Sequence, residues 1–213
     1  MIYDIEIAKH IAKSLLQINA IILEPEKPFK WASGWNSPIY CDNRKTLGYP
    51  EIRNYIRQGL SAIIKKHFQG SNIVAGVATA GIPHGVLVAE ELGLPFIYVR
   101  SSVKKHGKKN QIEGHFNVNQ SVVLVEDLIS SGKSSLDTVN ILREANLSVN
   151  GVISIFNYGF ETAKKNFTHS NCEYFSLCDY EVLLSEAIKS QYINSSDMQI
   201  LQDWQKNPSN WKK

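Results

Sequence analysis

The sequence predicts an α/β fold with a mostly parallel, twisted sheet flanked by helices. Short apolar segments alternate with stretches of helical periodicity through the middle of the chain. These segments are apolar on both faces, as the strands of a covered parallel sheet are. With 213 residues, the chain is long enough to bury roughly 70% of its unfolded surface, so one domain around one core is expected.

The first third of the chain predicts two helices with a turn-rich segment between them. Apolar residues recur at helical spacing over residues 5–18 and again over 49–68. The segment 29–44 instead combines aromatic residues with turn formers at Ser33–Gly34 and Ser37–Pro38. It is therefore expected to form short extended pieces joined by turns.

Four apolar segments predict the strands of the sheet, at residues 73–78, 96–100, 121–126 and 149–156. Helices are predicted after the first of these strands, through Leu92, and over residues 134–145. The tail from residue 179 predicts two short helices that end near Trp204, whose ring is expected to pack against the rest of the protein. The order of the strands does not follow from the sequence.

Composition narrows the class of protein. Hydrophobic residues make up 43% and charged residues 20%, which excludes wholesale disorder. The net charge of +3 is too small for nucleic-acid binding by the chain as a whole, so phosphate binding must be local. The three cysteines, Cys41, Cys172 and Cys178, predict reduced thiols and a cytoplasmic location. Neither a signal peptide nor a transmembrane helix is expected.

A strongly cationic loop follows the second predicted strand. Residues 101–115 contain two glycines, His106 and four lysines, at positions 104, 105, 108 and 109. An isolated charge run of this kind is usually a solvated surface loop. This one starts where parallel strands bind ligands, and it is long for a strand–helix connection. We therefore interpret it as a lid that closes over a polyanionic ligand.

The third predicted strand leads into the most informative motif. Glu126 and Asp127 end an apolar run, and Ser131–Ser134 opens the next helix with a loop whose backbone N–H groups can hold an anion. Since carboxylates repel phosphate, they are expected to face sugar hydroxyls or a divalent cation. The motif therefore predicts a phosphorylated sugar. The alternative is a surface acid pair followed by a helix cap from Ser131 or Ser134.

Two nucleotide-binding motifs are excluded. Gly132–Ser134 is similar to the end of a Walker A motif, but Asp127 stands where that motif needs its first glycine. No GxGxxG sequence occurs, which argues against a dinucleotide-binding fold.

The strand, acid pair and small-residue loop together resemble the phosphoribosyl pyrophosphate (PRPP) signature of type I phosphoribosyltransferases. The segment Phe29–Arg44, with its Ser-Gly-x-x-Ser-Pro-Ile-Tyr-x-Asp-x-Arg pattern, resembles the N-terminal signature of orotate phosphoribosyltransferases. Arg100, Lys104, His106 and Gly107 resemble the catalytic loop of that family.

The resemblance implies a type I phosphoribosyltransferase fold in a single domain, residues 1–213. Its parts would be an N-terminal hood and base-site segment over about 1–45, a PRPP-binding core over about 70–160 and a helical tail over 179–213. The implied reaction joins orotate to PRPP, giving orotidine 5′-monophosphate and pyrophosphate. The implied enzyme is a cytoplasmic homodimer that shares its catalytic loop between subunits, carries Mg²⁺ mainly on PRPP, and binds no nucleic acid or membrane.

The resemblance also implies roles for individual residues. The catalytic residues would be Lys104, His106 and Asp127. The pyrophosphate of PRPP would contact Arg100, Lys104 and His106. Its ribose and 5-phosphate would be held by Glu126, Asp127, Leu128, Ile129, Ser130, Ser131, Gly132, Lys133 and Ser134. Ser130 would also lie near orotate.

Three positions differ from some members of the family. The chain has Ala32 and Ala80 where some have lysine, and no arginine in 156–158, where some have an arginine that holds orotate. Backbone N–H groups of residues 33–37, or Arg44, are the candidates to hold the orotate carboxylate.

Two aromatic residues and two other functions allow alternative interpretations. Trp31 and Tyr40 are either core aromatics or substrate contacts. The competing functions are a phosphoribosyltransferase for a purine or uracil and a PRPP-sensing regulator without catalysis.

Overall fold

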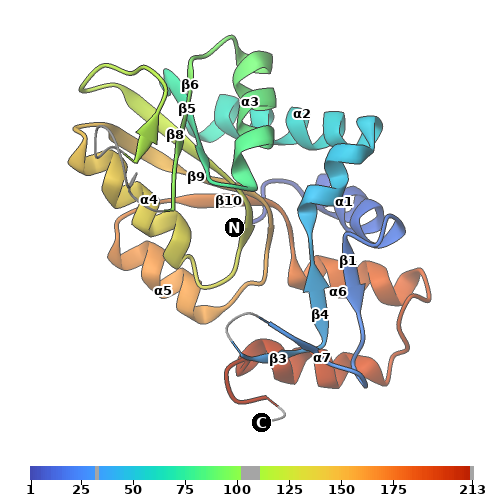
Figure 1. Cartoon of the computed structure of the whole chain (residues 1–213). Helices are drawn as coiled ribbons and strands as arrows, with labels where there is room; N and C mark the ends of the chain where they lie inside the picture. The colour runs from blue at the N-terminus through green and yellow to red at the C-terminus, as the bar shows by residue number, and fades with distance from the viewer. Residues whose placement is uncertain (32–33, 102–110, 212–213) are drawn as a thin grey trace.

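A six-stranded sheet forms the centre of the molecule in the computed structural model, which describes residues 1–31, 34–101 and 111–211 (Figure 1). The strand order is β10-β9-β8-β5-β6-β7, and only β7 runs antiparallel to its neighbour. The strands are β5 Ile73–Val77, β6 Phe96–Val99, β7 Ile112–Glu113, β8 Ser121–Ile129, β9 Ser148–Asn157 and β10 Tyr174–Asp179. The predicted α/β fold with a mostly parallel sheet is confirmed.

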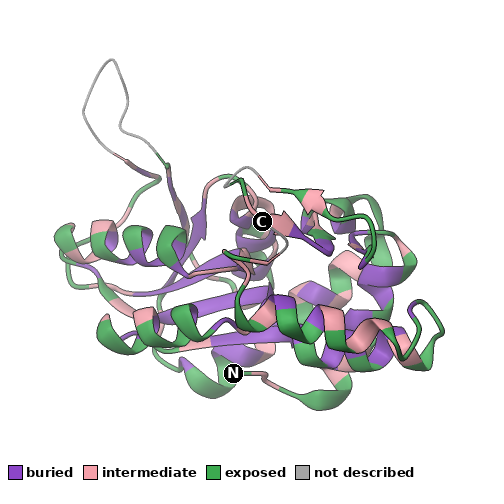
Figure 2. Cartoon of the chain, turned by 90° about the horizontal axis from the view of Figure 1, so that it is seen from below, coloured by how far each residue is buried: buried purple, intermediate pink, exposed green. Residues whose placement is uncertain are grey.

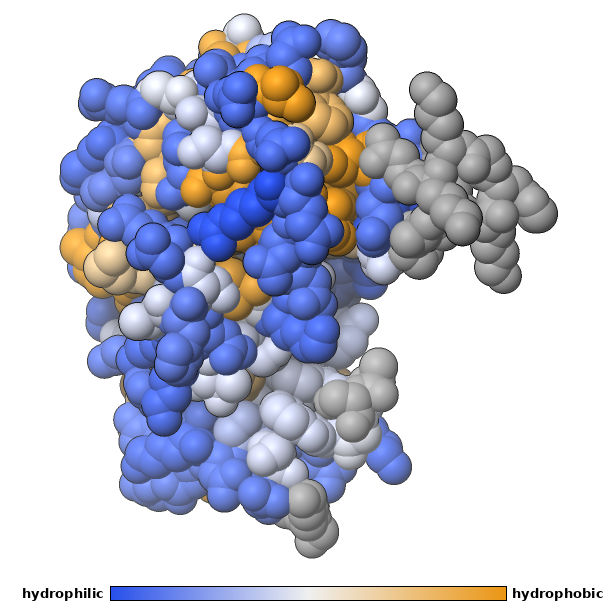
Figure 3. Space-filling view, turned by 90° about the vertical axis from the view of Figure 1, so that its left-hand side faces the viewer, coloured by the Kyte–Doolittle hydropathy of each residue, from blue (hydrophilic) through white to orange (hydrophobic). Residues whose placement is uncertain are grey.

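Helices cover both faces of this sheet, which Figure 2 shows as a buried layer between them. The helices are α1 Ile5–Gln17, α2 Pro50–His67, α3 Gly81–Leu92, α4 Lys133–Glu144, α5 Glu161–His169, α6 Tyr180–Lys189 and α7 Asp197–Lys206. Successive residues of a strand face opposite sides of the sheet, so Val123 and Val125 join the core under α1, α2 and α3, whereas Val122 and Leu124 join the core under α4 and α5. The outer face near α4 and α5 is mostly hydrophilic (Figure 3).

A second group of elements lies beside the sheet, at the lower right of Figure 1. It contains β1 Ile21–Leu23, β2 Phe29–Lys30, β3 Asn36–Ser37, β4 Ile39–Cys41 and the 3-10 helix η1 Asn43–Gly48. Two antiparallel pairs, β1 with β4 and β2 with β3, build it, and α7 of the C-terminal tail packs against it through Trp204. Trp204 of α7 is fully buried against Trp31, so the predicted packing of the Trp204 ring is confirmed.

Two features of the sheet differ from the sequence-based expectation. Strand β8 continues to Ile129, three residues beyond the predicted end at 126, so Glu126 and Asp127 lie within the strand. The edge strand β10 and the helix α5 before it were not predicted. Strand β10 carries Ser176 and Asp179 among its apolar residues, and such a short mixed pattern is weak as a sequence signal.

Candidate active site

Of the predicted site residues that the structure describes, Arg100 and the segment 126–134 lie at the carboxyl edge of the sheet, where β6 and β8 end beside β5. Val77 pairs with Val99 of β6, and Gly76 pairs with Val125 of β8. Neighbouring strands lie about 4.8 Å apart, so the residue after β6, Arg100, begins roughly 10 Å across the edge from the acid pair. Parallel α/β sheets bind their ligands at this edge.

Glu126 is a buried carboxyl group at this edge. The residue is only 6% exposed. Its Oε1 accepts a hydrogen bond from the Asp127 N–H at 3.0 Å, and its Oε2 accepts one from the Ser135 hydroxyl at 3.4 Å. Burial, and then the charge of Asp127, raises the pKa of Glu126 well above its usual value. Burial also raises the pKa of Asp127, although a hydrogen bond with Glu126 and the charge of Arg44 oppose the rise. The alternative of a surface acid pair is therefore wrong.

The buried acid pair has a consequence for stability, which a Glu126→Gln variant tests. The pKa of Glu126 in the folded protein lies above the usual 4.5. The stability that the neutral carboxyl group contributes is therefore lost as pH rises through this folded-state pKa and the group ionises. At neutral pH the neutral amide is expected to raise Tm by about 2–4 °C, the shift for 1 kcal/mol in a chain of this size. This gain should shrink as pH falls through the raised folded-state pKa toward the usual 4.5. Thermal melts of both proteins across pH measure it, and a constant difference would contradict it.

Gly81 sets the distance between α3 and the acid pair. A Cβ at this position would lie 2.4 Å from the backbone oxygen of Val125 and 3.4 Å from the Cα of Glu126. Only glycine therefore allows the first turn of α3 to approach β8 directly before the carboxylates.

A loop of small residues connects the acid pair to α4. Gly132 lies at the N-cap with φ +77° and no side-chain cap hydrogen bond, and a Cβ there would lie 2.7 Å from the ring of Phe167. The carbonyl of Ser131 accepts a hydrogen bond from Asn166 Nδ2 at 2.9 Å, and the Lys133 ammonium pairs with Asp137 at 2.6 Å. Residues of α5 thus hold the loop in position. The start of α4 presents backbone N–H groups, as an anion site requires.

The residues of this segment contribute in different ways. Ile129 is 1% exposed and its side chain belongs to the core under α4 and α5, so only its backbone is available to a ligand. Leu128 and Ser130 are half-buried and face the cavity described below. Ser134 is exposed in the first turn of α4.

Arg100 marks one end of the cationic loop. Its backbone N–H donates to Gln111 O at 2.9 Å, Gln111 Nε2 donates to Arg100 O at 3.2 Å, and the guanidinium lies 3.5 Å from Glu113 Oε1. These contacts hold the two ends of the loop together. Lys104, Lys105, His106, Lys108 and Lys109 lie outside the described residues, so their predicted roles remain predictions.

A cavity of about 400 Å³ adjoins the small-residue loop. It is lined by Lys30, Trp31, Tyr40, Cys41, Leu128, Ser130 and Tyr158. These residues come from the N-terminal hairpins, β8 and the end of β9, which are far apart in sequence. The rings of Trp31 and Tyr158 lie 5.2 Å apart. Such an aromatic cavity suits a planar ring. Ser130 lies both in its lining and in the loop of small residues, 130–134, which we call the anion loop.

Helix α7 holds the aromatic wall of this cavity in place. The ring of Trp204 lies 5.6 Å from Trp31 and 5.5 Å from Tyr158. Gln205 Nε2 donates to the carbonyl of Tyr158 at 2.8 Å. Tyr158 was not predicted as a site residue, because its only signal in the sequence is its position directly after an apolar strand.

Asn43 connects the N-terminal segment to β8, whereas Arg44 pairs within its own segment. Asn43 is fully buried and donates from Nδ2 to the Asp127 carbonyl at 2.8 Å. Arg44 is engaged by both carboxylate oxygens of Asp42, at 2.6 Å and 3.0 Å. It is absent from the described lining of the cavity, so the structure gives no support to the prediction that Arg44 holds a ring substituent there.

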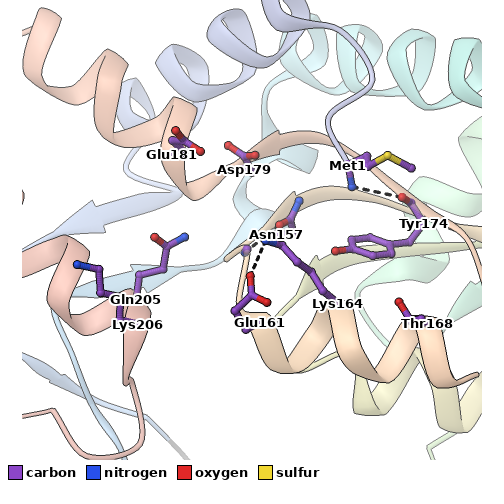
Figure 4. Close-up of a pocket in the computed structure, with 11 residues that line it drawn as sticks. Met1, Asn157, Glu161, Lys164, Thr168, Tyr174, Asp179, Glu181, Gln205 and Lys206 are labelled. Atoms are coloured by element: carbon purple, nitrogen blue, oxygen red, sulfur yellow. Dashed lines mark hydrogen bonds and ion pairs between the residues drawn. The ribbon is translucent and has the colours of Figure 1, made fainter.

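A second cavity, of about 510 Å³, lies at the ends of β9 and β10 and is shown in Figure 4. Its lining mixes charges, including Glu161, Lys164, Asp179 and Lys206, and Lys164 is paired with Glu161 at 2.6 Å. It contains none of the residues that the sequence predicted for the site. The acid pair and the anion loop therefore place the candidate active site at the aromatic cavity.

The described residues offer neither a metal-binding cluster nor a membrane-spanning helix. In residues 1–31, 34–101 and 111–211, no group of three or more His, Cys, Asp or Glu side chains is arranged to hold a metal ion. Within the same ranges, no helix is both long enough and apolar enough to span a membrane.

Comparison with known proteins adds independent findings. Residues 49–179 match the family model for the phosphoribosyl transferase domain. The orotate phosphoribosyltransferase of Cytophaga hutchinsonii is 50% identical over 205 residues, 96% of this chain and 98% of that protein. That of Bacillus subtilis is 50% identical over 198 residues, 93% of this chain and 92% of that protein.

Solved structures of orotate phosphoribosyltransferases are similar to this chain in fold. The orotate phosphoribosyltransferase of Aeropyrum pernix superimposes with a TM-score of 0.75 and 27% identity, covering 86% of this chain and 99% of that one. The orotate phosphoribosyltransferase of Mycobacterium tuberculosis, solved in complex with PRPP, has the same fold, with a TM-score of 0.64 and 18% identity over 83% of this chain and 98% of that one.

Proposed function

Because this chain belongs to the orotate phosphoribosyltransferase family, we propose that its anion loop binds PRPP and that its aromatic cavity binds orotate. The enzyme is a glycosyltransferase of class EC 2.4.2.10, which transfers the phosphoribosyl group to orotate and releases pyrophosphate. The observation that carries the assignment is that Ser130 belongs to both the loop and the cavity lining. A base in the cavity and a phosphate in the loop then meet beside Asp127.

The three parts of the chain have separate roles in this arrangement. The hood, about 1–45, supplies one wall of the base cavity, and the core, about 70–160, supplies the PRPP loop. The helical tail, 179–213, supports the aromatic wall. The contacts of Trp204 with Trp31 and Tyr158 favour this division.

PRPP is proposed to lie along the carboxyl edge of the sheet. Glu126 and Asp127 face the ribose hydroxyls, which can donate hydrogen bonds to carboxyl oxygens that burial has taken out of water. Backbone N–H groups of residues 130–134 hold the 5-phosphate. Arg100, together with Lys104 and His106 of the lid, holds the pyrophosphate, since cations stabilise the charge that develops as it leaves.

The transition state is expected to be loose, with positive charge on the ribose ring, because the orotate nitrogen is a modest nucleophile. The protein then has to orient two substrates and stabilise charge. Asp127 stabilises the cationic ring, Lys104 neutralises the pyrophosphate, and His106 supplies a hydrogen bond or proton to it.

Mg²⁺ and a second subunit complete the proposal. Mg²⁺ would be held mainly by PRPP oxygens and would neutralise the pyrophosphate. The similarity of residues 100–107 to the catalytic loop of the family supports a homodimer in which one subunit's loop reaches its partner's site.

The test is a direct assay of base choice. Orotate, uracil, hypoxanthine and adenine are each mixed with the protein, PRPP and Mg²⁺, and loss of the base is followed by ultraviolet absorbance. Only orotate is expected to be consumed, with pyrophosphate released in equal amount. Consumption of another base while orotate stays constant would reject the assignment of the cavity.

A further inference from the structure

We propose that Lys30 recognises the carboxylate of orotate and thereby selects an anionic pyrimidine over a neutral one. The inference rests on the proposed assignment of the aromatic cavity to orotate. It adds a residue that determines which pyrimidine the cavity accepts. From the sequence, the candidates to hold the carboxylate were the N–H groups of 33–37 and Arg44.

The described lining of the cavity offers one cationic partner for an anion. Orotate carries a carboxylate on its ring, and a carboxylate moved into an aromatic cavity loses hydration that only a cation or several donors can replace. Of the described residues that line the cavity, Lys30 alone is cationic. Leu128, Tyr158 and Trp31 present mainly apolar surface, and burial raises the pKa of the Cys41 thiol, which keeps that group neutral.

The local backbone gives Lys30 a defined position at the cavity. Strand β2 pairs with β3 in antiparallel register, with Lys30 opposite Asn36 and Phe29 opposite Ser37. Successive strand residues face opposite sides, so Phe29 and Lys30 diverge. The Phe29 ring packs 5.6 Å from Tyr40. The next residue, Trp31, is fixed by its Nε1 donating to Ile39 O at 3.1 Å.

The ammonium of Lys30 is available for a ligand. The side chain is exposed, and no acidic side chain among the described parts of the chain forms an ion pair with it. A lysine at the mouth of a cavity can therefore swing from water to an incoming carboxylate without breaking an internal pair.

Two of the other candidates for this role, Arg44 and the N–H of Gly34, are engaged elsewhere. Both oxygens of Asp42 hold Arg44, and the Arg44 side chain is 63% exposed. The N–H of Gly34 already donates to the Trp31 carbonyl at 2.8 Å. Lys30 is thus the described cation best placed to meet the carboxylate.

The experiment compares Lys30→Met with Lys30→Arg, Lys27→Met and Arg44→Met. Lys27 is an exposed lysine of the same segment and serves as the matched control. Initial rates give KM and kcat for orotate and KM for PRPP. Lys30→Met is expected to raise the orotate KM about 10- to 100-fold, the range for a lost hydrogen bond to a charged group. The PRPP KM should stay within about two-fold. Lys27→Met and Arg44→Met should keep the orotate KM of the wild type, since exposed charges contribute little. Lys30→Arg should recover most of the orotate affinity because it keeps a cation at this position.

A neutral analogue separates recognition from structural damage. Orotamide replaces the carboxylate with an amide, and its inhibition constant is measured against orotate. The wild type is expected to prefer orotate, and Lys30→Met should lose that preference because both ligands then lack a cationic partner. An unchanged orotate KM in Lys30→Met, or an equal rise in the PRPP KM, would overturn the proposal. Turnover of orotate by the wild type leaves the proposed function standing in either case.

Discussion

Replacing Asp127 with asparagine is expected to lower kcat by about 10²–10³, the usual loss when one preorganised electrostatic contact to a transition state is removed. The amide keeps the size of the side chain but carries no negative charge to face the cationic ribose. The Asp127 carbonyl that receives the Asn43 hydrogen bond is unchanged, so the fold and the strand should be retained. Steady-state rates with saturating PRPP and orotate measure the loss.

The control for this prediction is Asp137→Asn. Asp137 is an exposed acid on α4 whose carboxylate pairs with Lys133, and its side chain is 58% exposed. Its replacement is expected to change kcat by less than about two-fold, since exposed ion pairs contribute little. Equal rates for Asp127→Asn and the wild type would show that the acid pair does not act on the reacting ring.

Replacing Lys104 with alanine is expected to lower turnover by about 10²–10³ while the melting temperature stays close to that of the wild type. The reason is electrostatic, because the lid is proposed to neutralise the departing pyrophosphate. Lys108→Ala in the same segment is the matched control, since Lys108 is not among the residues proposed to contact the pyrophosphate. Turnover near the wild-type level in Lys104→Ala, or equal losses in both variants, would remove Lys104 from the reaction.

The local chemistry of the PRPP segment could be predicted from the sequence because its residues are consecutive. Glu126 and Asp127 are followed within a few residues by the helix start at Lys133, and the backbone carries each group to the next. A strand, a turn and a helix start place such groups with little freedom. The confirmed α/β class follows from the same kind of local pattern, repeated along the chain.

The base cavity could not be predicted in the same way. Lys30, Cys41, Leu128 and Tyr158 are separated by up to 128 residues, and no spacing rule relates them. Trp204, which supports two of the cavity rings, lies farther along still. Arg44 was a reasonable partner for a carboxylate from its charge, but its side chain is held by Asp42, two residues away.

The sequence by itself determined the class of fold, the acid pair and the anion loop, since these depend on periodicity and on neighbouring residues. Only the tertiary structure decided that β8 continues through Asp127, that Glu126 is buried, and which side chains surround the base. The physical reason is that burial and cavity shape arise from contacts between distant segments, and the desolvation that raises the pKa of Glu126 exists only after those segments have packed.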